Sequence, residues 1–353
     1  MNGDRAIAPG SPPGAMVLPE REGAGRGAGD APVSAGRRRF GAALVAATLL
    51  LIFAGAEVKS RQAGLSVPDW PLSYGMVWPP MVGNIFYEHG HRTIATGVGL
   101  LTVILGAWTL AAERRTWVRR LAVLAIVAVI VQGVLGGLTV KLLLPPPVSI
   151  AHGLLAQTFL LLVTLLAFAT SREWTEAPAR APVASPAAAR AQKAAVAAVI
   201  AVYVQLGFGL LVRHTESGLA IPFFPVSGEG ALAPDVVTWH VVLQLLHRGF
   251  ALVVLTAVMV AAVRVARAVP ELSTHARLAA ALVCVQILLG ASVIWTAGTD
   301  PANGITPIVA PVPTSLHVVT GAGLLATTFL LALRCGRRRA ATAAAAPTAA
   351  RTA

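Results

Sequence analysis

Eight apolar segments, each about as long as a membrane-spanning helix, determine what this chain can fold into. They lie near residues 40–58, 88–112, 119–140, 148–170, 192–212, 238–263, 277–297 and 314–334. Roughly 20 apolar residues in a helix cross the hydrocarbon core of a bilayer. The composition agrees, since 56% of the residues are hydrophobic and 12% are charged, which excludes a soluble domain. We therefore predict an all-α integral membrane protein with eight transmembrane helices.

The distribution of positive charge predicts how the chain crosses the membrane. A net charge of +13 would suggest a nucleic-acid partner if the basic residues formed one patch. Instead, they lie before the first segment, after the last one and in every second connection, near 37–39, 114–120, 172–193, 264–277 and 334–339. The positive-inside rule then predicts a multi-pass protein of the cell (plasma) membrane with both termini in the cytoplasm. No nucleic-acid partner is expected.

Composition also divides the chain into parts. Residues 1–36 are rich in Gly and Pro, and residues 338–353 are mostly Ala and Thr. Neither segment can form a core, so we predict two disordered cytoplasmic tails. The Ala/Pro-rich stretch 175–190 predicts a linker between an N-terminal half, 37–174, and a C-terminal half, 191–337.

The two halves repeat each other. The segment Gly64–Ser73 resembles Gly218–Ser227 at an offset of 154, and the pair Gln132 and Gly136 recurs at the same offset as Gln286 and Gly290. Each half contains four spans, and an even number makes the two copies run in the same direction through the membrane. We therefore predict two parallel-repeat four-helix bundles.

Four histidines near the starts of apolar segments predict a cofactor site. They are His91 and His152 in the first half and His247 and His317 in the second. Ionisable side chains inside a membrane are costly and usually functional. Two imidazoles from different helices can bind one haem iron from opposite sides. The alternative is that each histidine makes an interhelical hydrogen bond. The other four histidines, His89, His214, His240 and His275, lie at segment ends or connections and are weaker candidates.

Two polar neighbours of these histidines are further candidates. Glu88 lies three residues before His91, whereas Gln244 holds that position before His247. Residues three apart share a helix face, so Glu88 is a candidate proton-transfer group, or else a partner of the helix dipole. The arginines that follow the histidines, Arg92 and Arg248, can bind haem propionates or extend to the membrane surface.

Several of these motifs together resemble the haem A synthase family. They are the Pro-Asp-Trp-Pro centre of 64–75, Glu88-x-x-His91-Arg92, Gly136-Gly137-Leu138-Thr139 before His152, Arg213-His214-Thr215, Gly218-Leu219 and His247-Arg248. The resemblance covers all eight spans. It implies an oxidoreductase that converts the C8 methyl group of haem O to a formyl group, giving haem A for cytochrome oxidase.

The resemblance also implies a role for each half. Haem O, the substrate, would lie between His91 and His152 with Glu88 as the catalytic residue. Haem b, the cofactor, would have its iron bound by His247 and His317, with the haem sites toward the outer face of the membrane. A haem O synthase and an unidentified electron donor are expected partners besides the lipid bilayer. Whether the protein is a homo-oligomer stays open.

The chain departs from the family in its cysteines. Many relatives have cysteine pairs in the outer loops, where this chain has Val67 and Ser73, and then Ile221 and Ser227. Its two cysteines, Cys284 and Cys335, are expected to be packing or surface residues. Two other functions stay open at this point. A dihaem b-type electron carrier would share the four histidines without modifying its haem, and a two-repeat transporter would share the hydropathy.

Overall fold

The computed structural model describes residues 33–175, 185–225, 227, 230–231, 234–299, 307–308 and 310–345. The chain divides into two compact units, and all described residues belong to the second, Pro32–Ala353. Most of the predicted tail 1–36, most of the predicted linker 175–190 and the end of the chain after 345 lie outside the described residues.

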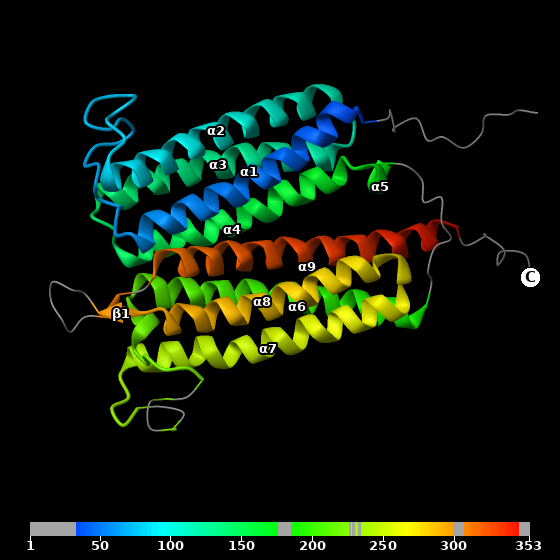
Figure 1. Ribbon diagram of the computed structural model, residues 1–353. Coiled ribbons are helices and arrows are strands. Elements are labelled where there is room, and N and C mark those ends of the chain that lie inside the picture. Colours follow the sequence, from blue (N-terminus) through cyan, green and yellow to red (C-terminus); the bar gives the residue numbers. More distant parts are fainter. Residues whose placement is uncertain are drawn as a thin grey trace, which may run out of the picture. The chain divides into compact units, whose positions relative to one another are not determined.

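Eight long helices form the described part of the chain (Figure 1). They are α1 (Ala35–Ser60), α2 (Gly83–Ala112), α3 (Thr116–Lys141), α4 (Pro146–Ala169), α6 (Pro186–His214), α7 (Trp239–Ala268), α8 (Ser273–Trp295) and α9 (Pro311–Ala345). Each is long and apolar enough to cross a membrane, which confirms the prediction of eight spans. Short elements connect them: α5 (Arg172–Thr175), η1 (Ser217–Leu219), η2 (Pro270–Leu272) and the antiparallel pair β1 (Gly298–Thr299) and β2 (Pro307–Ile308).

Two helix boundaries differ from the sequence prediction. Helix α6 begins at Pro186, inside the predicted linker 175–190, because the hydroxyl of Ser185 accepts a hydrogen bond from the amide of Ala188 and proline suits the first helical position. Helix α9 continues to Ala345, inside the predicted tail 338–353. Its last residues are mostly Ala and Arg, which favour helix without being apolar.

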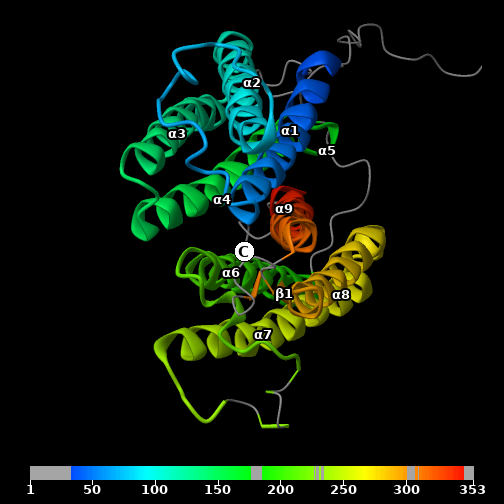
Figure 2. The same cartoon turned by 60° about the vertical axis from the view of Figure 1, so that its left-hand side comes forward.

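The helices of each half contact one another in a closed ring. Helix α1 contacts α2 and α4, and α3 contacts the same two helices; the contacts among α6, α7, α8 and α9 follow the same order. Between the halves, α9 contacts α1 and α4, and α4 also contacts α6. Figure 2 shows α9 between these two groups of helices.

The packing of the two halves rests on different side chains. In the first half, Leu44, Leu105 and Phe159 belong to one buried cluster. In the second half the buried clusters contain many alanines, among them Ala191 and Ala198 on α6. Small residues let helices approach closely, which is how helices associate where lipid removes the hydrophobic driving force.

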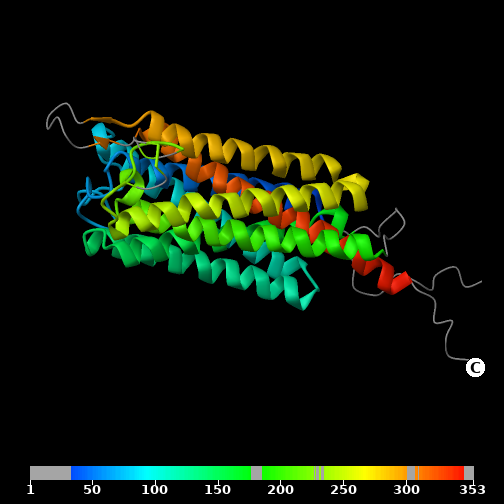
Figure 3. The same cartoon turned by 90° about the horizontal axis from the view of Figure 1, so that it is seen from below.

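The connections that follow α1, α3, α6 and α8 lie at one end of the helices, which we call the loop end (Figures 1 and 3). The opposite end carries α5 and the short connections that follow α2 and α7. Helices α2, α4, α7 and α9 therefore all begin at the loop end.

Candidate functional site

All four predicted ligand histidines lie at similar depth near the loop end. His91 and His247 each lie eight residues after the first residue of their helices, α2 and α7. His152 and His317 each lie six residues after the first residue of α4 and α9. At about 1.5 Å per residue these positions are about 9–12 Å from the helix starts. In each half, the two histidines therefore lie at a similar distance from the loop end.

In the second half, the imidazoles of His247 and His317 face each other from α7 and α9. Their ring centres are 6.4 Å apart and the ring planes are inclined by 73°. A metal–imidazole bond is about 2 Å long and the ring centre lies about 1 Å beyond the nitrogen, so two imidazoles on one iron have ring centres about 6 Å apart. The observed separation fits an iron ion bound between these two side chains.

In the first half, His91 and His152 lie within electrostatic reach of each other. Both imidazoles are partly buried, and within the described residues Nδ1 of each is buried without a hydrogen-bond partner. A buried polar atom without a partner costs free energy unless a ligand satisfies it or holds the ring in place.

Each of the four imidazoles lies against a glycine of the preceding helix. A Cβ atom placed on the glycine would approach Cε1 of the ring at 2.9 Å for Gly55 and His91, 3.2 Å for Gly136 and His152, 3.4 Å for Gly209 and His247, and 3.0 Å for Gly290 and His317. Every one of these glycines lies five residues before the end of its helix. The absence of a side chain makes room for the imidazole, so these positions shape the candidate haem sites.

Three glutamines also belong to the site, and our sequence analysis assigned none of them a role. The amide nitrogen of Gln132 lies 3.3 Å from Nε2 of His152, that of Gln205 lies 3.2 Å from Nδ1 of His247, and that of Gln286 lies 3.4 Å from Nε2 of His317. Each glutamine lies four residues before one of the site glycines. The pattern Gln-x-x-x-Gly, repeated three times, is the signal that could have identified them.

Glu88 and Gln244 both bind the connection at the loop end of their half, which follows α1 in the first half and α6 in the second. Oε2 of Glu88 accepts a hydrogen bond of 2.8 Å from the amide of Val67, and its Oε1 is 2.6 Å from the Arg92 guanidinium. In the second half, Oε1 of Gln244 accepts a bond of 2.5 Å from the amide of Ile221. Both side chains are buried. The predicted catalytic carboxylate is therefore also an anchor for the loop, which the sequence did not indicate.

The two arginines hold the same loops. Arg92 donates to the carbonyls of Asp69 and Leu72 at 2.7 and 2.9 Å, and Arg248 donates to the carbonyl of Ile221 at 2.8 Å. Hydrogen bonds from the Gly75 and Tyr74 amides lower the pKa of Asp69 and close the turn in the first loop. These hydrogen bonds hold the loop beside the histidines in one conformation.

The remaining histidines have other partners. His89 contacts the hydroxyl of Ser73 through Nδ1, and His240 contacts that of Ser217 in the same way. His275 lies in the first turn of α8 rather than in a connection, and its Nε2 is 3.0 Å from the carbonyl of Thr327. His214 ends α6 within electrostatic reach of His152.

Both cysteines are free thiols, with Cys284 exposed and Cys335 buried. Cys284 lies on α8 and Cys335 on α9. Neither lies in a connection at the loop end.

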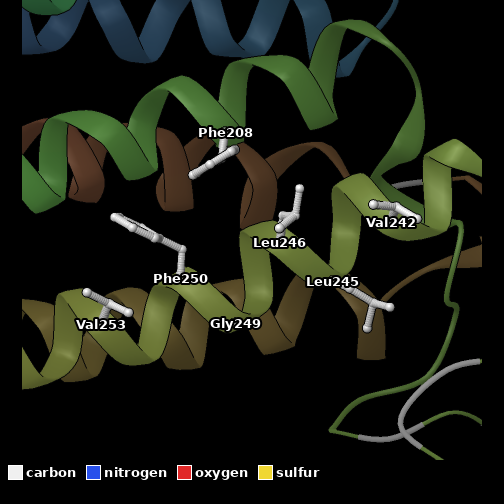
Figure 4. A pocket seen from close by; sticks show the side chains of 7 residues that line it. All are labelled: Phe208, Val242, Leu245, Leu246, Gly249, Phe250 and Val253. Atoms are coloured by element: carbon white, nitrogen blue, oxygen red, sulfur yellow. The ribbon is translucent and has the colours of Figure 1, made fainter.

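An apolar pocket lies beside α7, and none of the four predicted ligand histidines lines it. Phe208 of α6 and six residues of α7 line it: Val242, Leu245, Leu246, Gly249, Phe250 and Val253 (Figure 4). His247 is not among the lining residues, although Leu246 and Phe250 of the same helix are. With a fully apolar lining, this pocket suits hydrocarbon chains and supplies no chemical group.

Polar contacts join the two halves near the loop end. Arg213, near the end of α6, donates to the carbonyl of Ala56 at 2.7 Å and to the hydroxyl of Ser60 at 2.9 Å, both on α1. An ion pair between Lys59 and Glu216 lies close by. These contacts connect α1, which carries the Gly55 site, to α6, which carries the Gly209 site.

At the opposite end, Glu113 follows α2 in a cluster of arginines. Burial alone would raise the pKa of its carboxyl, but hydrogen bonds from Arg115 and the charges of Arg115 and Arg37 outweigh burial and lower it to about 2. Its Oε2 lies 2.8 Å from the Arg115 guanidinium and 3.2 Å from that of Arg37. Glu113 thus neutralises part of the positive charge at this end.

Comparisons with known proteins agree with this geometry. Residues 82–302 match the family model COX15-CtaA, described as "Cytochrome oxidase assembly protein", and this range includes Glu88 and three of the four histidines. A relative from Shouchella clausii is 31% identical over 76% of this chain and 90% of its own length, and one from Geobacillus thermodenitrificans is 27% identical over 86% and 94%. Both relatives are named "Heme A synthase". The chain therefore belongs to the COX15-CtaA family of cytochrome oxidase assembly proteins.

Proposed function

We propose that this chain synthesises haem A, by oxidising the C8 methyl group of haem O to a formyl group within the membrane. The observation that carries this proposal is the pair of facing imidazoles, His247 and His317, whose ring centres are 6.4 Å apart. Their counterparts, His91 and His152, recur in the first half at matching helix positions. The relatives named "Heme A synthase" support the same activity.

His247 and His317 bind the iron of a resident haem b, and His91 and His152 bind the substrate, haem O. Two protein ligands per site suit haem, because the porphyrin supplies the other four iron ligands. Within the described residues no group of three or more His, Cys, Asp or Glu side chains gathers to hold a bare metal ion. When bound, the haem of the second half supplies electron-transfer chemistry close to the substrate.

Glu88 is the catalytic residue of the first half. Its carboxylate can take up or release a proton at Oε1 or Oε2, which the amide of Gln244 cannot do. The two side chains make the same type of contact with their loops, to the amides of Val67 and Ile221. The difference between the halves is therefore a chemical one, and it assigns oxidation to the first half and electron storage to the second.

The substitution Glu88→Gln tests this assignment, with Gln244→Glu as its matched control. An amide at position 88 can still accept the hydrogen bond from Val67, as Gln244 does from Ile221. We expect Glu88→Gln to retain both haems and lose haem A formation, measured by extracting pigments after expression with haem O supply. We expect Gln244→Glu to keep forming haem A. Normal haem A production by Glu88→Gln would rule out the proton-transfer role.

The same experiment separates this function from a dihaem electron carrier. A carrier would use the four histidines and bind haem, but would form no haem A in any variant. It also requires no carboxylate at position 88.

We propose that the protein lies in the cell membrane with both termini in the cytoplasm and the haem sites toward the outer face. Four arginines at the end opposite the loops support this orientation by the positive-inside rule: Arg114, Arg115, Arg119 and Arg120. Arg92 and Arg248 stay candidates for binding the haem propionates, because each directly follows a ligand histidine near the loop end.

A further inference from the structure

One arrangement occurs four times in this chain, once in each pair of helices α1–α2, α3–α4, α6–α7 and α8–α9. The first helix of each pair carries a glycine five residues before its end, and this glycine faces the histidine of the second helix. In three pairs a glutamine lies four residues before the glycine, at Gln132, Gln205 and Gln286. In the pair α1–α2 that position is Leu51.

Gln205 and Gln132 each hold their histidine at two points, and the side chain of Gln286 contacts the ring of His317. The amide nitrogen of Gln205 donates to the carbonyl of His247 at 2.9 Å and also lies 3.2 Å from Nδ1 of its ring. Gln132 contacts the carbonyl and the ring of His152 at 3.1 and 3.3 Å. Each contact joins two neighbouring helices, so it restrains both the helix and the imidazole.

The oxygens of these amides are available to the rings. Oε1 of Gln132, Gln205 and Gln286 is buried, and within the described residues none has a hydrogen-bond partner. In Gln286, whose side chain contacts only the ring of His317, Oε1 can exchange places with Nε2 and accept a ring N–H. In Gln132 and Gln205 the bond to the histidine carbonyl fixes Nε2 in place, so these two amides restrain the ring from the donor side. An acceptor for the second ring nitrogen is the usual support of a metal-binding histidine.

His91 lacks this support. The side chain of Leu51 offers neither donor nor acceptor, and within the described residues no side-chain amide contacts the ring of His91. The backbone carbonyl of Leu51 lies near this ring, as that of Gln286 lies 3.1 Å from Nδ1 of His317, so the pair α1–α2 keeps the backbone contact and lacks the amide. His91 is therefore restrained by packing against Gly55 but not by an amide side chain.

We infer that Leu51 makes His91 the exchangeable ligand of the first half, and that Gln132, Gln205 and Gln286 are positioning residues that make the other three histidines firm ligands. This inference rests on the proposed function, in which haem O enters and haem A leaves the first half while haem b stays in the second. Loss of the side chain that holds a metal-binding histidine by hydrogen bonds weakens metal binding by about 10- to 100-fold. A difference of this size suits one site that releases its haem and one that retains it.

Transfer of haem to excess apomyoglobin, followed by absorbance, tests the inference on the full-length protein with both haems bound. We expect two phases, a fast one from the first half and a slow one from the second. Leu51→Gln should slow the fast phase by about 10-fold or more. Leu51→Met, which keeps the volume without adding an amide, should leave it unchanged. Damage to the fold would speed haem loss, so slower loss is a specific result.

The reverse substitution gives a second, independent test. Gln205→Leu, which removes the amide that contacts the carbonyl and the ring of His247, should speed the slow phase by about 10-fold or more. Unchanged rates in both Leu51→Gln and Gln205→Leu, with both haems bound and haem A still formed, would overturn the inference alone. A protein that takes up no haem would overturn the proposed function as well.

Discussion

The closest contact between a glycine and an imidazole in the second half makes Gly290→Ala a sharp test of the haem site. A Cβ atom at position 290 would lie 3.0 Å from Cε1 and 3.4 Å from Nδ1 of His317. Carbon atoms prefer separations of about 3.5–4.0 Å, so the ring would have to move by about 0.5 Å or more. Metal–ligand distances tolerate deviations of about 0.2 Å. We therefore expect the substitution to displace His317 from the iron.

The same substitution should stabilise the helix rather than weaken it. Alanine is favoured over glycine in a helix interior by about 1 kcal/mol, so the helix itself should not be weakened. A loss of haem without a loss of thermal stability in the apoprotein would therefore identify ring displacement as the cause. Since we propose one haem for each half, we expect the haem content per protein to fall by roughly half. We expect the affinity of the second-half site for haem to fall by about 10-fold or more.

Haem content and the low-spin absorbance spectrum of purified variants measure this effect. Gly323→Ala on α9 is the matched control, since a Cβ there meets nothing within 4 Å. Gly209→Ala should have a smaller effect than Gly290→Ala, because its Cβ would lie 3.4 Å from the His247 ring. If Gly290→Ala keeps its full haem content and an unchanged spectrum, His317 does not bind iron from the position seen in this structure.

Two further predictions concern stability. The pKa of Glu113 is lowered from 4.5 to about 2, so its ion pairs stabilise the fold fully above about pH 4.5 and lose this effect as the pH falls toward 2. Glu113→Gln should therefore lower the free energy of unfolding by about 3 kcal/mol at pH 7 and by less at lower pH. A loss that does not change with pH, measured by thermal unfolding, would contradict this. Arg213→Met removes the hydrogen bonds to Ala56 and Ser60. We expect the free energy of unfolding, measured by thermal unfolding, to fall by about 1–3 kcal/mol. An unchanged free energy would mean that these bonds do not join the halves.

The sequence was sufficient to predict the helices because the membrane imposes a length and a polarity on each of them. The segments near 88–112 and 148–170 correspond to α2 (Gly83–Ala112) and α4 (Pro146–Ala169). Their ends were less predictable, since a helix continues past its apolar part where caps and helix-favouring residues allow it. The extension of α9 through the Ala- and Arg-rich stretch to Ala345 is the largest case.

The histidines could be predicted because both halves carry one near the start of the second and of the fourth apolar segment, which distinguishes them from isolated polar residues. Their surroundings could not be predicted in this way. Gly55 and Gly209 look like ordinary transmembrane glycines until the fold places an imidazole against each of them. The link between Glu88 and Val67 joins residues 21 apart through a loop whose path has no periodicity in the sequence. Long-range contacts of this kind depend on the tertiary structure and have no local signature.

Comparing Glu88 with Gln244 shows that the carboxylate in the first half is not needed to hold the loop. Both side chains are buried and both accept a hydrogen bond from a loop amide, so holding the loop requires an acceptor but no charge. A buried charge costs desolvation energy and must be paired, as Glu88 is with Arg92 at 2.6 Å. Gln244 accepts the equivalent hydrogen bond from Ile221 without a charge, and so without that desolvation energy. The negative charge at position 88 therefore needs a reason other than stability, and a group that exchanges protons beside the substrate provides one.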